Sequence, residues 1–170
     1  MSELRAEEIV KELLAAWNAR DLDGLVALLA EDVEWYDPAM TDPPARGKEA
    51  VKAFSESVLE AFPDFTFEMV PPLCSSSDGS RCAFRWRITA THSRPLRPMG
   101  YAPTNRTATM EGVDVLEIRD GKVAAILTAF DPLPAAEQLL GMKLRPAMGT
   151  FRGWMAVALQ RLLAFFARRR

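Results

Sequence analysis

Histidine and cysteine are scarce in this 170-residue chain, which contains one His and two Cys. With so few of these ligands, and none at ligand-like spacing, we expect no metal site. Cys74 and Cys82 lie in strand-like runs that a hairpin would bring together, but we expect two free, partly buried thiols. Unpaired cysteines suit a reducing cytoplasm, which is where we expect the protein. The first residues lack a positively charged start followed by an apolar core, so we expect no secretory signal.

Acidic residues are absent after Glu137, although the whole chain has a net charge of −2. Seven of the 21 Lys and Arg residues lie in residues 138–170, so the preceding part carries 14 basic and all 23 acidic residues, or −9. An acidic body argues against binding of nucleic acid by the body. Length and a hydrophobic content of 49% fit one soluble domain with an appendage, which we place at residues 1–141 and 142–170.

Helical spacing dominates the first third of the chain. Apolar residues recur at helical spacing from Leu4 to Trp17, Asp21 can cap a second short helix through Ala30, and Gly47 begins a third helix. A short strand is predicted at residues 32–37. After the third helix the period becomes two, and strands are predicted at residues 65–73, 81–92, 106–118 and 122–130. Early helices and late antiparallel strands predict an α+β fold, with helices against one face of a curved sheet.

Two aspartates fall on the apolar faces of predicted strands. Asp37 shares its face with Trp35, and Asp114 shares one with Leu116, because alternate strand residues point the same way. Burial disfavours an ionised carboxylate, so each side chain must find a partner or take up a proton. Groups with shifted pKa values are candidates for a functional site.

Plainer roles are open for the same residues. Asp37 precedes a proline and can end its strand by accepting backbone amides, and Asp114 can accept a hydrogen bond from Trp17 or Trp86. His92 can relay protons or be a satisfied residue at the rim.

The inward side chains of the predicted sheet form one concave surface that can hold a hydrophobic small molecule. The residues expected to contact this substrate are Trp17, Trp35, Phe84, Trp86, Ile88, His92, Leu116, Ile126, Thr128 and Phe130. Small side chains at Gly112, Ala124 and Thr128 are expected to leave room for a cavity. The opposite face is also apolar, with Val113, Val115, Val123 and Leu127. A sister subunit in a homodimer, or the C-terminal tail, is expected to cover it.

Several segments make the sequence similar to known families. The stretch 15–32, the Asp37-Pro38 pair, Gly47 and the stretch 112–123 resemble the bacterial ketosteroid isomerases. The loop 100–106 is similar to that of the SnoaL-like polyketide cyclases, and the resemblance covers residues 9–141. Both belong to the nuclear transport factor 2-like superfamily. The resemblance implies a cone-shaped antiparallel sheet with the N-terminal helices packed on its concave face.

The resemblance to the isomerases also implies catalytic roles for both aspartates. It implies that Asp37 moves a proton on a hydrophobic carbonyl compound, and that a protonated Asp114 hydrogen-bonds the developing enolate, without a cofactor. The tyrosine that donates to the oxyanion in these isomerases falls on Leu13, which has no donor. Side chains considered as replacements are Tyr36, Tyr101 and His92.

The resemblance to the cyclases is incomplete as well. Their acid/base aspartate in the final strand falls on Thr128, and their histidine falls on Asp114. The epoxide hydrolases of the superfamily need an arginine between two aspartates, whereas the alternation points Arg85 and Arg87 outward. The alternative to an isomerase-like or cyclase-like enzyme is a protein of the same fold that binds a hydrophobic molecule without catalysis, or an assembly module with a vestigial pocket.

The C-terminal extension is predicted to form an amphipathic helix. A helical projection of residues 151–166 gathers the large apolar side chains over about half of the circumference, and three arginines end the chain. The segment is too short, and too interrupted by arginine, to span a bilayer. We expect residues 150–170 either to touch an anionic membrane surface peripherally, at the inner membrane, or to dock on the protein or a partner subunit.

Overall fold

A computed structural model of the chain describes residues 2–97, 100–145, 147 and 149–167. The chain forms two compact units, Met1–Leu140 and Gly141–Arg170. The elements of the first unit are α1 (Ser2–Ala19), α2 (Leu22–Ala27), β1 (Leu29–Tyr36), β2 (Ala45–Arg46), α3 (Gly47–Ala61), β3 (Thr66–Ser75), β4 (Arg81–Thr91), β5 (Thr107–Arg119), β6 (Lys122–Phe130) and α4 (Pro132–Leu140). The second unit contains α5 (Phe151–Ala167).

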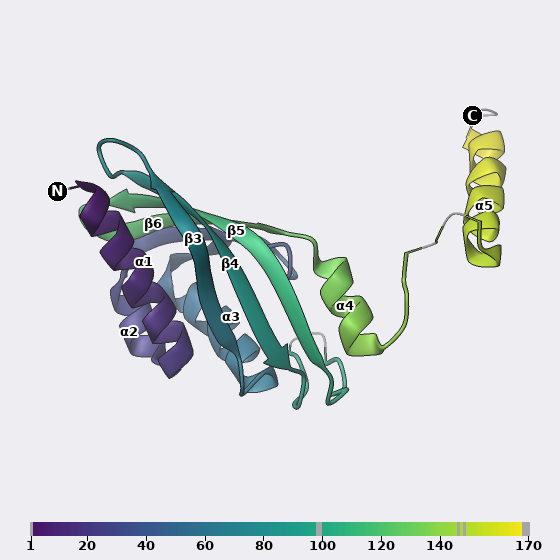
Figure 1. Ribbon diagram of the computed structural model, residues 1–170, viewed down its shortest axis with the longest axis horizontal. Coiled ribbons are helices and arrows are strands. Elements are labelled where there is room, and N and C mark those ends of the chain that lie inside the picture. Colours follow the sequence, from purple (N-terminus) through teal and green to yellow (C-terminus); the bar gives the residue numbers. More distant parts are fainter. Residues whose placement is uncertain (1, 98–99, 146, 148, 168–170) are drawn as a thin grey trace. The chain divides into compact units, whose positions relative to one another are not determined.

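The six strands form one curved sheet in the order β2-β1-β6-β5-β4-β3 (Figure 1). The predicted α+β fold is confirmed, with one strand pair that differs from the expectation. Strand β1 runs parallel to β6, while the other neighbouring pairs are antiparallel. A parallel pair needs a long connection, which α3 and the four intervening strands provide.

Helices α1, α2 and α3 lie on one side of the sheet, where α1 packs on β3 and α3 packs on β1 (Figure 1). The side-chain amide of Asn18 in α1 donates to the carbonyl oxygen of Phe67 at 2.9 Å and accepts from its N–H at 2.8 Å. This pair of bonds fixes the end of α1 against β3. Asp21 caps α2 as predicted, because its carboxylate accepts from the N–H of Gly24 at 2.8 Å.

One helix ends earlier than predicted, and another helix was not predicted. Helix α2 ends at Ala27, not at Ala30, because Leu29 already pairs with Val123 in β6. Helix α4 was not predicted, although Pro132 suits a first helical position. Its Gln138 side chain accepts from the N–H of Thr109 and donates to the Thr109 carbonyl oxygen, each at 2.9 Å. These bonds pair backbone groups of β5 that lie beyond the end of β6.

The expected position of Val123 on the outer face is wrong. Val123 is fully buried, because the pairing of β5 with β6 shifts between Glu117 and Ile118. Glu117 pairs with Ala125 and Ile118 with Val123, so a bulge at this point reverses the alternation along β6. The rest of the prediction for the outer face is sound, since Leu127 is exposed there. That a sister subunit covers this face stays a prediction.

The two cysteines are free thiols, as expected from the sequence. Cys82 is buried on β4, and Cys74 is exposed on the neighbouring strand β3. Burial raises the pKa of the Cys82 thiol to about 11, so this group stays protonated and unreactive near neutral pH.

Candidate functional site

Asp114 lies in the interior of the sheet, in the middle of β5. Its side chain is only 4% exposed, and its neighbours across the sheet are Phe84 on β4 and Thr128 on β6. The indole N–H of Trp86 donates to Oδ1 of Asp114 at 2.9 Å. One of the two tryptophans suggested by the sequence is therefore its partner.

Thr128 completes the surroundings of Asp114. The indole N–H of Trp35 donates to the hydroxyl oxygen of Thr128 at 2.9 Å. Because this oxygen already accepts from Trp35, the hydroxyl hydrogen of Thr128 is available for the carboxyl group of Asp114, whose pKa Thr128 lowers. Thr128 and Trp86 are thus the neutral polar groups that favour ionised Asp114.

Burial raises the pKa of Asp114 to about 6, against the opposing effect of the hydrogen bonds from Thr128 and Trp86. The negative charge of Asp37 raises the same pKa further. The two buried carboxyl groups are therefore linked electrostatically.

Asp37 follows the last residue of β1 and is 8% exposed. Its Oδ1 accepts from the N–H of Ala39 at 2.7 Å, so the strand-ending role expected of an aspartate before a proline is present. Burial nevertheless raises the pKa of Asp37 to about 6, and the Ala39 hydrogen bond opposes this rise only in part.

Among the described residues, no arginine or lysine forms an ion pair with Asp37 or Asp114. Within the described part of the chain, every ion pair lies elsewhere and joins other carboxylates to cations. Burial raises the pKa of both groups, and the negative charge of Asp37 raises that of Asp114, so ionisation of Asp37 opposes ionisation of Asp114. Such a pair can accept a proton at one carboxylate and donate one from the other. Nor do the described residues include a cluster of three or more His, Cys, Asp or Glu side chains suited to a metal ion.

The ten residues predicted to contact a substrate all lie with the interior cluster. Ile88 and Phe130 are partly exposed, and the other eight are buried. Trp86 stands between two aromatic rings, with centroids 5.8 Å from Phe67 and 5.7 Å from Phe130. Whether these side chains contact a substrate stays a prediction.

The space expected at Gly112 is filled by Trp86. A Cβ atom on Gly112 would overlap the indole ring, so this glycine provides room for Trp86 and not for a ligand. Trp86 on β4 is the direct cross-strand partner of Gly112 on β5, which explains the contact. Gly112 therefore positions the partner of Asp114.

Two of the three side chains predicted as possible replacements for the isomerases' oxyanion-donating tyrosine lie outside the interior. Leu13 is buried in α1, so no donor stands at that position. Tyr36 and Tyr101 are exposed, at 45% and 60%, and cannot donate within the interior as described.

His92 remains inside, next to the end of β4. It is 4% exposed, and its ring lies 5.3 Å from that of Phe62. Burial lowers the pKa of His92, so the ring is neutral near pH 7. Its Nε2 has no hydrogen-bond partner among the described residues. The plainer role predicted for His92, a residue at the rim with its hydrogen bonds satisfied, therefore does not describe this nitrogen.

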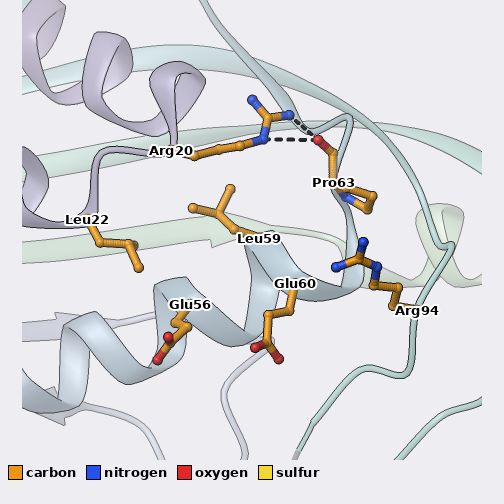
Figure 2. Close-up of a pocket in the computed structure, with 7 residues that line it drawn as sticks. All are labelled: Arg20, Leu22, Glu56, Leu59, Glu60, Pro63 and Arg94. Carbon is orange, nitrogen blue, oxygen red and sulfur yellow. Dashed lines mark hydrogen bonds between the residues drawn. The ribbon is translucent and has the colours of Figure 1, made fainter.

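A separate shallow pocket of about 290 Å³ lies on the surface beside α3 (Figure 2). Its lining residues are Arg20, Leu22, Glu56, Leu59, Glu60, Pro63 and Arg94. The Arg20 guanidinium points to the carbonyl oxygen of Pro63 and donates to it at 3.0 Å through Nε (Figure 2). None of these residues was predicted from the sequence as part of a site, and none touches the aspartate pair in the bonds described above.

The comparisons with known proteins concern the family and the fold of the chain. A model of the SnoaL-like domain matches residues 10–126. AclR from Streptomyces galilaeus, described as a candidate hydroxylase, is 27% identical with a TM-score of 0.66, over 81% of this chain and 96% of its own. IdmH from Streptomyces antibioticus, described as a candidate polyketide cyclase, is 26% identical with a TM-score of 0.65, over 81% and 99%.

A candidate polyketide cyclase from Xanthomonas campestris shares the fold at 18% identity, with a TM-score of 0.70 over 82% of this chain and 99% of its own. None of the curated proteins matches the chain. The family model covers more than half of the sequence, so the chain belongs to the SnoaL-like domain family of the nuclear transport factor 2-like superfamily.

Proposed function

We propose that the protein is a cofactor-independent proton-transfer enzyme that acts on a hydrophobic carbonyl compound, as an isomerase or a cyclase. The observation that carries this proposal is the pair of buried carboxyl groups, Asp37 and Asp114, whose pKa values both rise to about 6. Carboxyl groups with pKa values near the working pH are efficient general acids and bases. The side chains that surround them are aromatic and aliphatic, which supports an apolar substrate rather than a polar one.

The two aspartates have different surroundings, and these support different roles. Asp37 uses Oδ1 for the amide of Ala39, which leaves Oδ2 for a proton from the carbon next to the substrate carbonyl. Ionised Asp37 raises the pKa of Asp114, which favours the protonated form of Asp114. In the proposed reaction, Asp37 removes the carbon-bound proton, and the O–H of Asp114 donates a hydrogen bond to the enolate oxygen. Return of the proton from Asp37 to carbon restores both groups.

The named relatives favour the same class of substrate. IdmH, at 26% identity, is described as a candidate polyketide cyclase, and polyketides carry carbonyl groups with acidic neighbouring C–H bonds. Ring closure of such a compound begins with the proton removal proposed for Asp37.

The second candidate function is non-catalytic binding of a hydrophobic molecule. Two observations favour it. Leu13 offers no donor at the position of the isomerases' tyrosine, and Thr128 holds Asp114 at the position of the cyclases' acid/base aspartate. Loss of one oxyanion donor reduces a rate by about a hundredfold to a thousandfold.

Two assays on the purified full chain distinguish these functions. A β,γ-unsaturated steroid ketone is converted to its conjugated isomer by an isomerase, with a rise in enone absorbance. Exchange of carbon-bound hydrogen for deuterium in a polycyclic aromatic ketone, followed by NMR, reports proton removal without requiring isomerisation. Catalysis in either assay supports the enzyme. Tight binding of a phenolic steroid with neither conversion nor exchange would support the binder and contradict the enzyme.

A further inference from the structure

The C-terminal unit contains a helix whose large apolar side chains are exposed. Within α5, nine such residues are exposed, and the largest exposed fractions are 74% for Phe151 and 68% for Trp154. The nine are Phe151, Trp154, Met155, Val157, Leu159, Leu162, Leu163, Phe165 and Phe166. We propose that α5 binds the surface of an anionic lipid bilayer through this apolar face and so holds the protein at a membrane without crossing it.

Helix α5 has its own start signal. Thr150 caps the helix, because its hydroxyl oxygen accepts from the N–H of Gly153 at 3.1 Å and its carbonyl oxygen accepts from the N–H of Trp154 at 2.9 Å. Gly149, with φ of 79°, provides the left-handed backbone just before this cap. The helix thus begins at a point specified by its own sequence.

The apolar side chains form a face wide enough to enter a bilayer. At 100° per residue, eight of them lie on about half of the circumference, with Met155 and Leu162 near its centre. The opposite side carries Gln160 and small residues such as Ala164. Trp and Phe on the apolar face are typical of helices that lie in the interface between lipid and water.

Charge identifies the lipid class. Residues 138–170 contain seven Lys and Arg residues and no acidic residue. Basic residues near an anionic bilayer are attracted to its surface, and aromatic and aliphatic side chains add the burial of their apolar area. The last three arginines contribute to this charge in the sequence, although they lie outside the described residues.

A bilayer fits this helix better than a second copy of the chain does. On the outer sheet face, the exposed apolar residues Val113 and Leu127 are flanked by the ion pairs of Arg81 with Glu117 and of Arg85 with Glu111. Docking of the apolar face of α5 here would remove these charged groups from water, whereas a bilayer offers the face an apolar interior. No helix in the described residues is both long and apolar enough to cross a membrane, so the proposed binding is to the surface only.

Sedimentation of the full chain with lipid vesicles tests the proposal. We expect pelleting with vesicles that contain phosphatidylglycerol and much less with pure phosphatidylcholine. Salt at about 1 M, where the screening length falls to about 3 Å, should weaken the association. Trp154 is the single tryptophan of α5, so the emission difference between the wild type and Trp154→Phe reports its burial in lipid. The emission maximum of Trp154, obtained by this subtraction, should move to shorter wavelength only with the anionic vesicles.

A matched pair of variants separates insertion from simple charge attraction. Met155→Asp with Leu162→Asp places two acids on the apolar face, and Gln160→Asp with Ala164→Asp makes the same charge change on the opposite face. We expect the first variant to lose binding by about tenfold or more, because burial of each apolar side chain is lost, and the second to lose much less.

Equal losses in both variants, equal binding to neutral and anionic vesicles, or no binding at all would overturn the proposal. A change of oligomeric state in the first variant, without lipid binding by the wild type, would show instead that α5 docks on another copy.

Discussion

The two faces of strand β5 place carboxylates in opposite surroundings. On the outer face, Glu111 is exposed and lies 2.7 Å from Arg87, whose hydrogen bond and charge lower the pKa of Glu111. On the inner face, three residues further along, burial raises the pKa of Asp114 to about 6, and Asp37 adds a like charge. The same strand therefore stabilises one ionised carboxylate and destabilises the other.

This difference distinguishes a structural carboxylate from a functional candidate. Exposed ion pairs such as that of Glu111 cost little to form and contribute little stability. A buried carboxyl group without a cation lowers stability at neutral pH, and an apolar residue of similar size would avoid the loss. Stability alone does not account for Asp114 or Asp37, whereas proton transfer needs groups of this kind.

The largest effect is expected at Asp37. Asp37→Asn keeps the shape of the side chain but removes the base, so turnover should fall by about a hundredfold to ten-thousandfold in the ketone assays. Glu111→Gln, the same kind of change on the outer face, should leave turnover unchanged. Equal activity of wild type and Asp37→Asn would exclude this residue as the base.

The pH dependence of kcat/KM in the wild type sharpens this prediction. The reaction needs Asp37 ionised and Asp114 protonated, and the pKa of each is about 6. Activity should therefore rise to a maximum near pH 6 and fall on both sides, because acid protonates the base and alkali ionises the donor. A profile that is flat from pH 5 to 8 contradicts this assignment.

Asp114→Asn should stabilise the protein at high pH, although it replaces the proposed O–H donor by an amide. The pKa of Asp114 rises from 3.8 to about 6 in the folded state, so its proton is held more tightly when folded. Protonated Asp114 therefore adds to the free energy of unfolding. This contribution is fully present below about pH 4 and is lost as the pH rises through about 6. The amide escapes this loss, so its advantage in urea unfolding should grow by up to about 3 kcal/mol between pH 4 and pH 8.

The outer face again supplies the control for this experiment. Glu111→Gln should show no such gain at high pH, because the pKa of Glu111 is lowered by Arg87 and the folded protein prefers the ionised form. A pH-independent difference between Asp114→Asn and the wild type would mean that Asp114 titrates normally.

Much of this comparison was visible in the sequence, because alternation assigns faces without coordinates. Counting by twos placed Asp37 with Trp35 and Asp114 with Leu116, and all four are buried. The SnoaL-like fold and the C-terminal helix were predicted correctly as well. The homodimer, the cytoplasmic location and the absence of nucleic-acid binding stay predictions.

What the sequence could not supply were relations between distant residues. The bond from Trp35 to Thr128 joins positions 93 residues apart, and only the parallel pairing of β1 with β6 brings them together. The reversal at Val123 depends on a bulge that alternation cannot reveal. Alternation predicts space at Gly112, but the register of β4 with β5 places the Trp86 ring there.

Trp86→Phe should have an intermediate effect, a rise in the pKa of Asp114 on the inner face. Phenylalanine keeps aromatic contact with Phe67 and Phe130 but has no N–H for Asp114. Loss of one hydrogen bond to the ionised form should raise the pKa of Asp114 from about 6 to roughly 7. Carboxyl ¹³C NMR titration measures this, and the alkaline limb of the activity profile should move with it. An unchanged pKa would show that Trp86 does not hold the carboxylate.

The smallest effect is expected from Arg87→Gln on the outer face. Its partner Glu111 is exposed and also lies 3.3 Å from Arg85, so water and a second cation can replace the lost pair. Urea unfolding at neutral pH should therefore change little, and turnover should not change. The pKa of Glu111 should move back toward its ordinary value, because the largest cause of its lowering is the hydrogen bond from Arg87. A large loss of stability or activity would mean that the two faces of β5 are coupled, and the inner pair could then no longer be treated as electrostatically separate from the outer ion pairs.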